Sequence, residues 1–324
     1  MTRRSPLLPL AGMACAALAL TACGSETLDT AGSSTSSASS AASSSSSSAA
    51  SSETSSSSES SGASGGVDEA LAAKVPDKIK SAGTIIVGSD ASYAPNEYLG
   101  SDGKTVEGMD VDLFNAVAAK LGLKTEFQNA KFDSIILGVK SGKFDVGVSS
   151  FTINPDRMKE VNMVSYFNAG TQWAVAKGNP EGVNLDNLCG LTIGVQKGTV
   201  QVEDITARSK KCTDGGKDAI KVVQDDLQSN VTAGLVAGKT VAMLADSPIT
   251  AYAVTQTQGK VELLGDVYDA APYGFVVPKD QADFAQAIAD ALKAIEADGS
   301  YQKALETWGN TGGAISDFAV NPAG

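Results

Sequence analysis

The chain has 324 residues, of which 37 are Asp or Glu and 25 are Lys or Arg, and its formal net charge at pH 7 is −12. It contains no histidine. An acidic surface repels nucleic acid and anionic lipid, so nucleic acid is not expected among the partners. The usual general base of serine and cysteine hydrolases is also missing, which disfavours triad catalysis.

The first part of the chain has the pattern of a secretory signal. Two arginines precede an apolar run from Leu7 to Leu20, and a run of about 14 residues is too short to span a bilayer. The run ends in Leu-Thr-Ala-Cys, which resembles the bacterial lipobox, where the cysteine is acylated and the chain is cut before it. We expect a signal peptide over 1–22 and a palmitate-type lipid anchor on Cys23. An ordinary secretory signal with an incidental cysteine is the alternative.

Serine dominates the segment that follows, and apolar side chains are rare in it. Such a composition buries too little apolar surface to offset chain entropy. We therefore expect a disordered tether over 23–66 and a globular domain over 67–324. This arrangement predicts a protein anchored by lipid to the outer face of the cell membrane, preferably in a Gram-positive-type envelope.

Two cysteines remain in the domain, Cys189 and Cys212. Outside the cytoplasm, two such thiols are most simply a disulfide. Separate buried thiols and a metal pair are the alternatives, although zinc is disfavoured because the chain has neither histidine nor a C-x-x-C motif. The sequence predicts no metal and no cofactor.

Short β-branched runs alternate with helical patterns along the domain. Strands are expected over 84–88, 124–127 and 144–148, and helices over 111–121 and 135–142. This βαβαβ order is typical of a mostly parallel sheet covered by helices.

The alternation resumes after an extended stretch over 161–176, which predicts a second α/β lobe. A cleft between two such lobes would hold a ligand at the carboxyl ends of the strands. The remaining expected elements are strands over 191–195, 220–223, 241–244 and 273–277, and helices over 200–209, 227–237, 248–255 and 282–308.

Glycines and polar residues follow four of these strands, over 88–95, 148–157, 196–201 and 244–248. Together with the segments Gly108–Leu113 and Ser141–Asp145, their order and spacing resemble the bacterial extracellular solute-binding proteins of family 3, which serve ABC importers of polar amino acids. The resemblance covers nearly all of the chain from Lys78 to Asn310.

The family architecture implies an α/β, two-lobed periplasmic-binding-protein-like fold of type II. Each lobe is then a mixed sheet flanked by helices, with the ligand in the cleft between the lobes. The first lobe would comprise about 78–170 and 270–324, and the second about 175–265.

The resemblance also implies how an amino acid is held at its charged end. A zwitterion that has lost its water needs donors for the carboxylate and an acceptor for the ammonium, because an unpaired buried charge is costly. Arg157 matches the residue that grips the α-carboxylate as a bidentate fork, and Thr152, Gly198 and Thr199 would add donors, the last two at a helix start. A surface arginine, a turn threonine and a helix cap are the alternatives.

The resemblance also implies partners for the α-ammonium and for the side chain of the bound amino acid. Asp246 matches the carboxylate that receives the α-ammonium, and its alternative is a simple helix cap. The carbonyl of Ser150 would assist Asp246. The other implied ligand residues are Ser149 at the same strand end and, for the side chain, Asp90, Tyr93 and Phe132.

Some of these assignments have open alternatives or departures from the family pattern. Asp90 could be a turn residue, and Tyr93 and Phe132 could be lobe core. Asp110 and Asp112 are expected to open a helix and not to bind metal. Two residues depart from the family pattern close to the expected ligand, Asn96 in place of an aromatic residue and Val200 in place of a threonine.

We therefore expect the extracellular substrate-binding component of an ABC importer, specific for a polar or basic amino acid or for glutamine, and not an enzyme. Its partners would be a free amino acid, the permease subunits and the membrane, and the protein would be a monomer. The alternatives are a dehydratase-like enzyme on the same fold, for which Glu97 is a candidate base, and a ligand-presenting sensor.

Overall fold

The computed structural model describes residues 66–323, so the expected signal peptide, Cys23 and the Ser-rich segment lie outside the described residues. Within that range, the helices are all too short or too polar to cross a bilayer.

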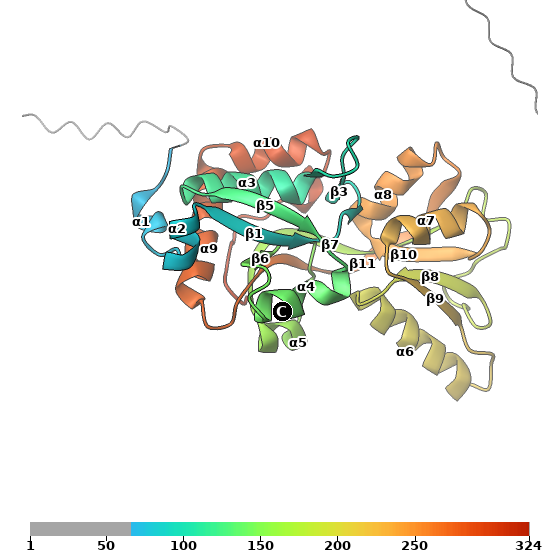
Figure 1. Cartoon of the computed structure of the whole chain (residues 1–324). Coiled ribbons are helices and arrows are strands. Elements are labelled where there is room, and N and C mark those ends of the chain that lie inside the picture. Colours follow the sequence, from blue (N-terminus) through green and yellow to red (C-terminus); the bar gives the residue numbers. More distant parts are fainter. Residues whose placement is uncertain (1–65, 324) are drawn as a thin grey trace, which may run out of the picture. The chain divides into compact units, whose positions relative to one another are not determined.

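The first βαβαβ unit is present as predicted (Figure 1). The central strand β1 (Thr84–Ser89) pairs in parallel with β5 (Lys124–Asn129) and with β6 (Val146–Gly147). Helices α3 (Met109–Lys120) and α4 (Phe132–Lys140) connect these strands. The last predicted strand of the unit is shorter than expected.

Two long antiparallel strands, β7 (Asn162–Ala176) and β11 (Val261–Val277), run through the middle of the sheet. They join both halves into one eight-stranded mixed sheet of order β5-β1-β6-β11-β7-β10-β8-β9, in which β8 is Thr192–Gln196, β9 is Lys221–Asp225 and β10 is Ala242–Asp246. Strand β11 begins earlier than predicted. Its first part is largely exposed, and its pairing with β7 is irregular between Leu264 and Ala271. The sequence there lacks the buried alternation that reveals a strand.

The second α/β unit also follows the predicted order. Its parallel strands β8, β9 and β10 lie beyond β7, and each is followed by a helix or preceded by one. The elements are β8 (Thr192–Gln196), α6 (Val200–Asp214), β9 (Lys221–Asp225), α7 (Gln228–Val236), β10 (Ala242–Asp246) and α8 (Ser247–Gln256).

The single helix expected over 282–308 was wrong. The structure has α9 (Ala282–Ala297) and α10 (Ser300–Thr307), and between them Gly299 has φ 82°. A left-handed residue cannot continue a right-handed helix, and glycine adopts that conformation without steric cost.

Several short elements were not predicted, because they contain too few residues to show a period. They are α1 (Glu69–Ala72), α2 (Asp77–Ala82), the small sheet of β2 (Ser92–Tyr93), β3 (Glu97–Leu99) and β4 (Val106–Glu107), α5 (Pro155–Glu160) and the 3-10 turn η1 (Thr311–Gly313).

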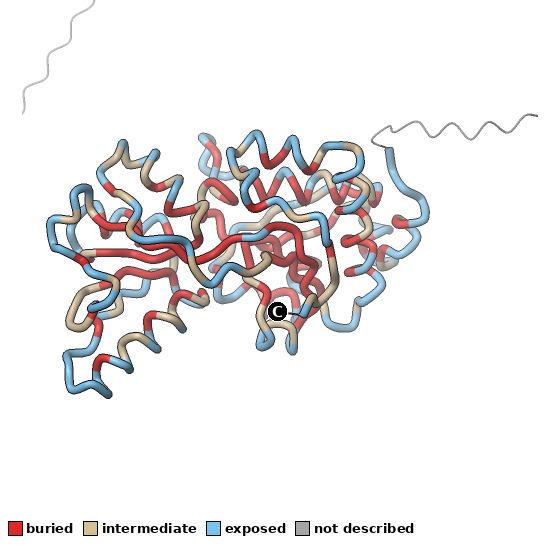
Figure 2. Tube along the Cα trace, turned by 180° about the vertical axis from the view of Figure 1, so that it is seen from behind, coloured by how far each residue is buried: buried red, intermediate tan, exposed pale blue. Residues whose placement is uncertain are grey.

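Each end of the sheet has its own core. Phe114, Tyr166 and Phe275 belong to the core of what we call the first lobe, which draws on both ends of the described chain. Trp173 and Ile205 belong to the core of the second lobe. Figure 2 shows buried backbone through the middle of the sheet, where the buried strand β7 connects the two cores. The lobe boundaries near 170–175 and 265–270 stay a prediction.

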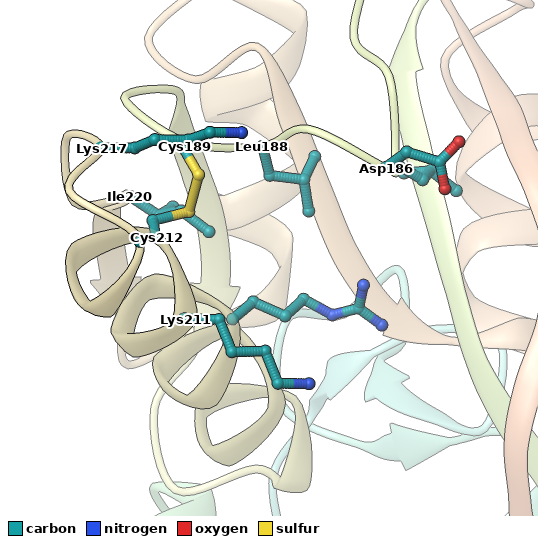
Figure 3. Close-up of a pocket in the computed structure, with 10 residues that line it drawn as sticks. Asp186, Leu188, Cys189, Lys211, Cys212, Lys217 and Ile220 are labelled. Carbon is teal, nitrogen blue, oxygen red and sulfur yellow. A yellow bond between two sulfur atoms is a disulfide. The ribbon is translucent and has the colours of Figure 1, made fainter.

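The expected disulfide is confirmed in the second lobe, where Cys189 and Cys212 are bonded (Figure 3). It ties the loop before β8 to the end of α6, across a separation of 23 residues.

Removing that bond should lower the free energy of unfolding. Closing a loop of this length lowers the conformational entropy of the unfolded chain, which stabilises the folded protein by about 3 kcal/mol. We expect a Cys189→Ser/Cys212→Ser double variant to lose about that much in urea denaturation. Dithiothreitol should destabilise the natural protein but leave the double variant unchanged, and equal stability of the two oxidised proteins would contradict the prediction.

Candidate functional site

A small cavity of about 10 Å³ lies between the lobes. A larger hollow of about 340 Å³ adjoins the disulfide, but Arg157 and Asp246, charged groups from the two lobes, converge on the small cavity, and we place the candidate site there. Its wall is formed by Tyr93, Phe132, Ser150, Thr152, Arg157, Thr199, Val200, Gln201 and Asp246.

Arg157 is the cation of this cavity. Helix α5 presents it, and the side chain of Asn154 caps that helix by accepting from the Arg157 N–H at 2.8 Å. The guanidinium donates to the carbonyls of Thr152 at 2.8 Å and Gly198 at 3.2 Å, so it contacts both lobes. Burial lowers the pKa of Arg157 to about 10, which leaves the group charged at neutral pH.

Asp246 is the anion of the cavity, at the end of β10. Its carboxylate accepts from the Tyr93 hydroxyl at 2.8 Å and from the Gln201 amide at 2.7 Å. The helix-cap alternative does not hold for this side chain, since its oxygens are engaged with these groups and not with the N–H groups that open α8. Burial raises the pKa of the Asp246 carboxyl, while the two hydrogen bonds and the charge of Arg157 oppose that rise.

Aromatic rings form the apolar part of the wall. Phe132, at the start of α4, stacks on Phe151 with ring centroids 4.6 Å apart. The Arg157 guanidinium carbon lies 5.5 Å from the Phe132 centroid and 5.4 Å from that of Phe151. Phe132 and Tyr93 are buried and face the cavity, so they serve as core and as wall at once.

Asp90 lies outside the cavity wall in this conformation. Its carboxylate accepts at 3.0 Å from the N–H groups of Ser92 and Phe132 and from the side-chain amide of Gln196 in the second lobe. Asp90 is therefore a turn residue, as the alternative suggested, and it also contacts Gln196 of the second lobe.

Three more predicted residues contribute less directly. Ser149 lies behind the wall, where its hydroxyl accepts from the Asp90 N–H at 3.0 Å. A Cβ on Gly198 would lie 2.8 Å from the Cβ of Asp133, so the close approach of the lobes requires glycine there. Thr199 lines the wall, and its hydroxyl donates to the Gln196 carbonyl at 2.8 Å.

The two departures from the family pattern differ in their placement. Asn96 is buried behind the wall and donates to the Ser150 hydroxyl at 2.9 Å, so its effect on the cavity is indirect. Val200 belongs to the wall and offers a methyl surface where a threonine would offer a hydroxyl. Sequence reasoning missed Gln201, and the available signal was its place in the first turn of α6, next to Val200.

The expectation for Asp110 was incomplete. Helix α3 does begin at Met109, but the Asp110 side chain is fully buried and accepts from Ser150 and Tyr166. Asp112 accepts from the Trp308 indole at 2.8 Å. Across residues 66–323 no group of three acidic, Cys or His side chains is arranged to hold a metal ion.

Ion pairs also cross between the lobes near the cavity. Lys197 of the second lobe lies 2.7 Å from Asp133 of the first, and Lys131 of the first pairs with Asp226 of the second. All four side chains are at least partly exposed.

Removing Asp226 should weaken ligand binding slightly, because closed lobes would lose one exposed ion pair worth about 0.2–1 kcal/mol. We expect Asp226→Asn to raise the Kd about two- to fivefold at low ionic strength. Titration in 1 M salt, where the Debye length is about 3 Å, should erase most of that difference. An effect that persists at high salt would contradict the electrostatic explanation.

A mixed sheet with helices on both faces, two cores and a charged cavity between them define a two-lobed solute-binding protein. Residues 85–311 match the family described as bacterial extracellular solute-binding proteins, family 3, and the chain belongs to that family.

Relatives and solved structures agree with this assignment. The arginine-binding protein ArgT of Corynebacterium glutamicum is 32% identical over 252 residues, which cover 78% of this chain and 82% of the relative. An ancestral arginine-binding protein solved with arginine is 34% identical, with a TM-score of 0.64 over 70% of this chain and 98% of that one. The ancestral amino acid-binding protein AncCDT-1, a precursor of cyclohexadienyl dehydratase, is 30% identical, with a TM-score of 0.62 over 72% and 98%. The α/β, type II fold expected from the sequence is thereby confirmed.

Proposed function

We propose that this protein captures a basic amino acid, L-arginine first, outside the cell and delivers it to the permease of an ABC importer. The observation that carries the proposal is the convergence of Arg157 and Asp246 on one cavity with an aromatic wall. The named specificities of the arginine-binding relatives support the choice of ligand.

The proposed pose pairs each charge of the zwitterion with its opposite. Arg157 receives the α-carboxylate, since a guanidinium has five N–H donors and only some are engaged with protein carbonyls. Asp246 receives the α-ammonium beside Tyr93. The aliphatic stem of the ligand lies along Phe132, and a side-chain cation gains about 1 kcal/mol from aromatic rings.

Entry of the ligand requires the lobes to part. In this structure the lobes touch through Arg157 and Gly198, Tyr93 and Asp246, and Asp90 and Gln196. The proposed hinge lies where β7 and β11 pass between the two cores, near the irregular pairing of Leu264 to Ala271.

A thermal-shift panel tests the ligand class. At 100 times Kd, a ligand that binds only the folded protein adds about 2.7 kcal/mol to its stability. We expect the largest shift with L-arginine, smaller shifts with lysine and glutamine, and none with glutamate. No shift with any free amino acid would refute the proposed function.

The enzyme alternative has less support. Glu97, the carboxylate considered as a base, is fully buried behind Ser149 and Ser150 and lies outside the cavity wall. A base must come within hydrogen-bond reach of the proton that it removes. We therefore propose binding without chemistry.

The lipid anchor belongs to the same proposal. A tether that holds the protein at the membrane raises its effective concentration near the permease. We expect the Cys23→Ala variant to be released into the medium and the natural chain to stay with the membrane fraction, as measured by immunoblotting. Equal partitioning of the two chains would contradict lipidation at Cys23, whereas Cys15→Ala, which alters the expected signal alone, should leave anchoring unchanged.

A further inference from the structure

Ser150, which lines the cavity, has an unusual backbone conformation. Its φ is 47°, in the left-handed region that a residue with a side chain adopts at a cost of about 1–2 kcal/mol. Surrounding groups must hold such a residue in place.

Asp110 is one of these groups. Its Oδ2 accepts from the Ser150 N–H at 2.9 Å and lies 3.1 Å from the Ser150 hydroxyl. The Tyr166 hydroxyl donates to the same oxygen. Asp110 comes from α3 and Tyr166 from β7, so Asp110 holds the backbone of Ser150 directly and Tyr166 holds Asp110 in place.

Glu97, on β3, is the second group. Its Oε1 accepts from the Ser149 hydroxyl at 2.9 Å, and its Oε2 lies 3.2 Å from the Ser150 hydroxyl. Both carboxyl groups are fully buried. Together they contact the backbone N–H of Ser150 and the hydroxyls of both serines.

The surroundings of the pair are acidic. The ionisable groups that face it are the carboxyl of Asp90 and the hydroxyls of Tyr166 and Tyr93. Within residues 66–323 neither carboxyl of the pair has a salt-bridge partner, and Oδ1 of Asp110 has no hydrogen-bond partner in the protein.

Two adjacent buried carboxyls without a cation cannot both ionise easily. Burial raises the pKa of Asp110 to about 6. Burial, followed by the negative charge of Asp110, raises the pKa of Glu97 well above its ordinary value. One proton retained between the two groups would supply the missing partner of Asp110.

We propose that Glu97 and Asp110 are positioning residues for the ligand site, a carboxyl pair joined by one proton that holds Ser150 in the left-handed conformation in which it lines the cavity. The inference rests on the proposed function, because the position of Ser150 matters to binding only when an amino acid occupies that cavity. Loss of the shared proton leaves two facing negative charges, which displace Ser150 and weaken binding.

The direction of the pH effect follows from the raised pKa values. The folded protein favours the protonated pair, so this contribution to stability is present at acid pH. It is lost as the pH rises from the ordinary carboxyl range near 4 through about 6 and beyond. Glu97→Gln replaces the shared proton by an amide hydrogen that does not titrate, and it should remove this dependence.

Calorimetric titration of the full chain with L-arginine between pH 5.5 and 9 tests the proposal. We expect the affinity of the natural protein to fall about tenfold across this range, and that of Glu97→Gln to stay within about twofold. Asp110→Ala should bind about tenfold more weakly at every pH, because it removes the single oxygen, Oδ2, that accepts from the Ser150 N–H and from the Tyr166 hydroxyl. Asp112→Asn, on the same helix, is the matched control and should behave as the natural protein.

Parallel pH profiles of the natural protein and Glu97→Gln would overturn the role of the pair. If no amino acid binds at any pH, the proposed function fails. The melting temperatures of the ligand-free proteins then test whether Glu97 and Asp110 share a proton. A melting temperature that falls with rising pH in the natural protein, relative to Glu97→Gln, supports the shared proton. Equal slopes overturn it.

Discussion

We expect the Arg157→Ala variant to show no measurable arginine binding at micromolar ligand. Truncating one side of a buried, hydrogen-bonded charge pair costs about 2–5 kcal/mol, which is a loss of at least about 30-fold in affinity. The loss arises because the α-carboxylate would be buried without the guanidinium that now lies beside the stacked rings of Phe132 and Phe151. Calorimetric titration of arginine into the variant measures it.

Two other variants make this prediction specific. Arg157→Lys keeps the charge but not the planar fork, so we expect an intermediate affinity. Arg208→Ala is the matched control, because Arg208 is the other described arginine and lies in the second lobe, 5.7 Å from the Trp173 ring and 2.8 Å from Asp204. Unchanged arginine affinity in Arg157→Ala would refute the proposed carboxylate site.

Asp246→Asn should weaken binding about 30-fold or more at neutral pH. The amide keeps the shape of the carboxylate but leaves the buried α-ammonium without a counter-charge, a loss in the same range of 2–5 kcal/mol. Gln201 can still donate to the amide oxygen in the place of Oδ1, and the Tyr93 hydroxyl can accept from the amide NH2 in the place of Oδ2, so the folded protein should melt near the natural temperature. Titration and thermal melting of the same preparations separate the two effects.

The pH dependence of this site has the opposite sign to that of the carboxyl pair. Because burial raises the pKa of Asp246, its carboxylate becomes neutral as the pH falls, and the α-ammonium then loses its counter-charge. We expect affinity in the natural protein to decline below pH 5.5, under the range used to test the carboxyl pair, and Asp246→Asn to lack that decline. Asp218→Asn, an exposed carboxylate of the same lobe, should retain it.

Sequence reasoning located the elements that have many residues and a clear period. It found the strand that ends at Asp246, because a buried strand repeats its pattern over several residues, whereas α5, which carries Arg157, is too short to show a period. It failed for the first part of β11, where exposed polar residues hide the strand, and at Gly299, where one glycine divides a helical pattern.

The site was harder to predict than the fold, because its contacts join residues distant in the sequence. Asp90 matched a ligand-binding position, but whether its carboxylate faces the cavity depends on Gln196 of the other lobe. Asp110 looked like an ordinary helix start, and only the fold places it against Glu97 and Ser150. Local patterns carry no information on such pairings.

The central claim is that the cavity recognises both charges of an α-amino acid. The most direct test is calorimetric titration of the full chain with L-arginine and with agmatine, which has the same guanidinium side chain but no carboxylate. We predict one L-arginine bound per chain and an agmatine affinity at least about 30-fold weaker, since Arg157 would have no carboxylate to bind. Equal affinity for the two compounds would contradict the account.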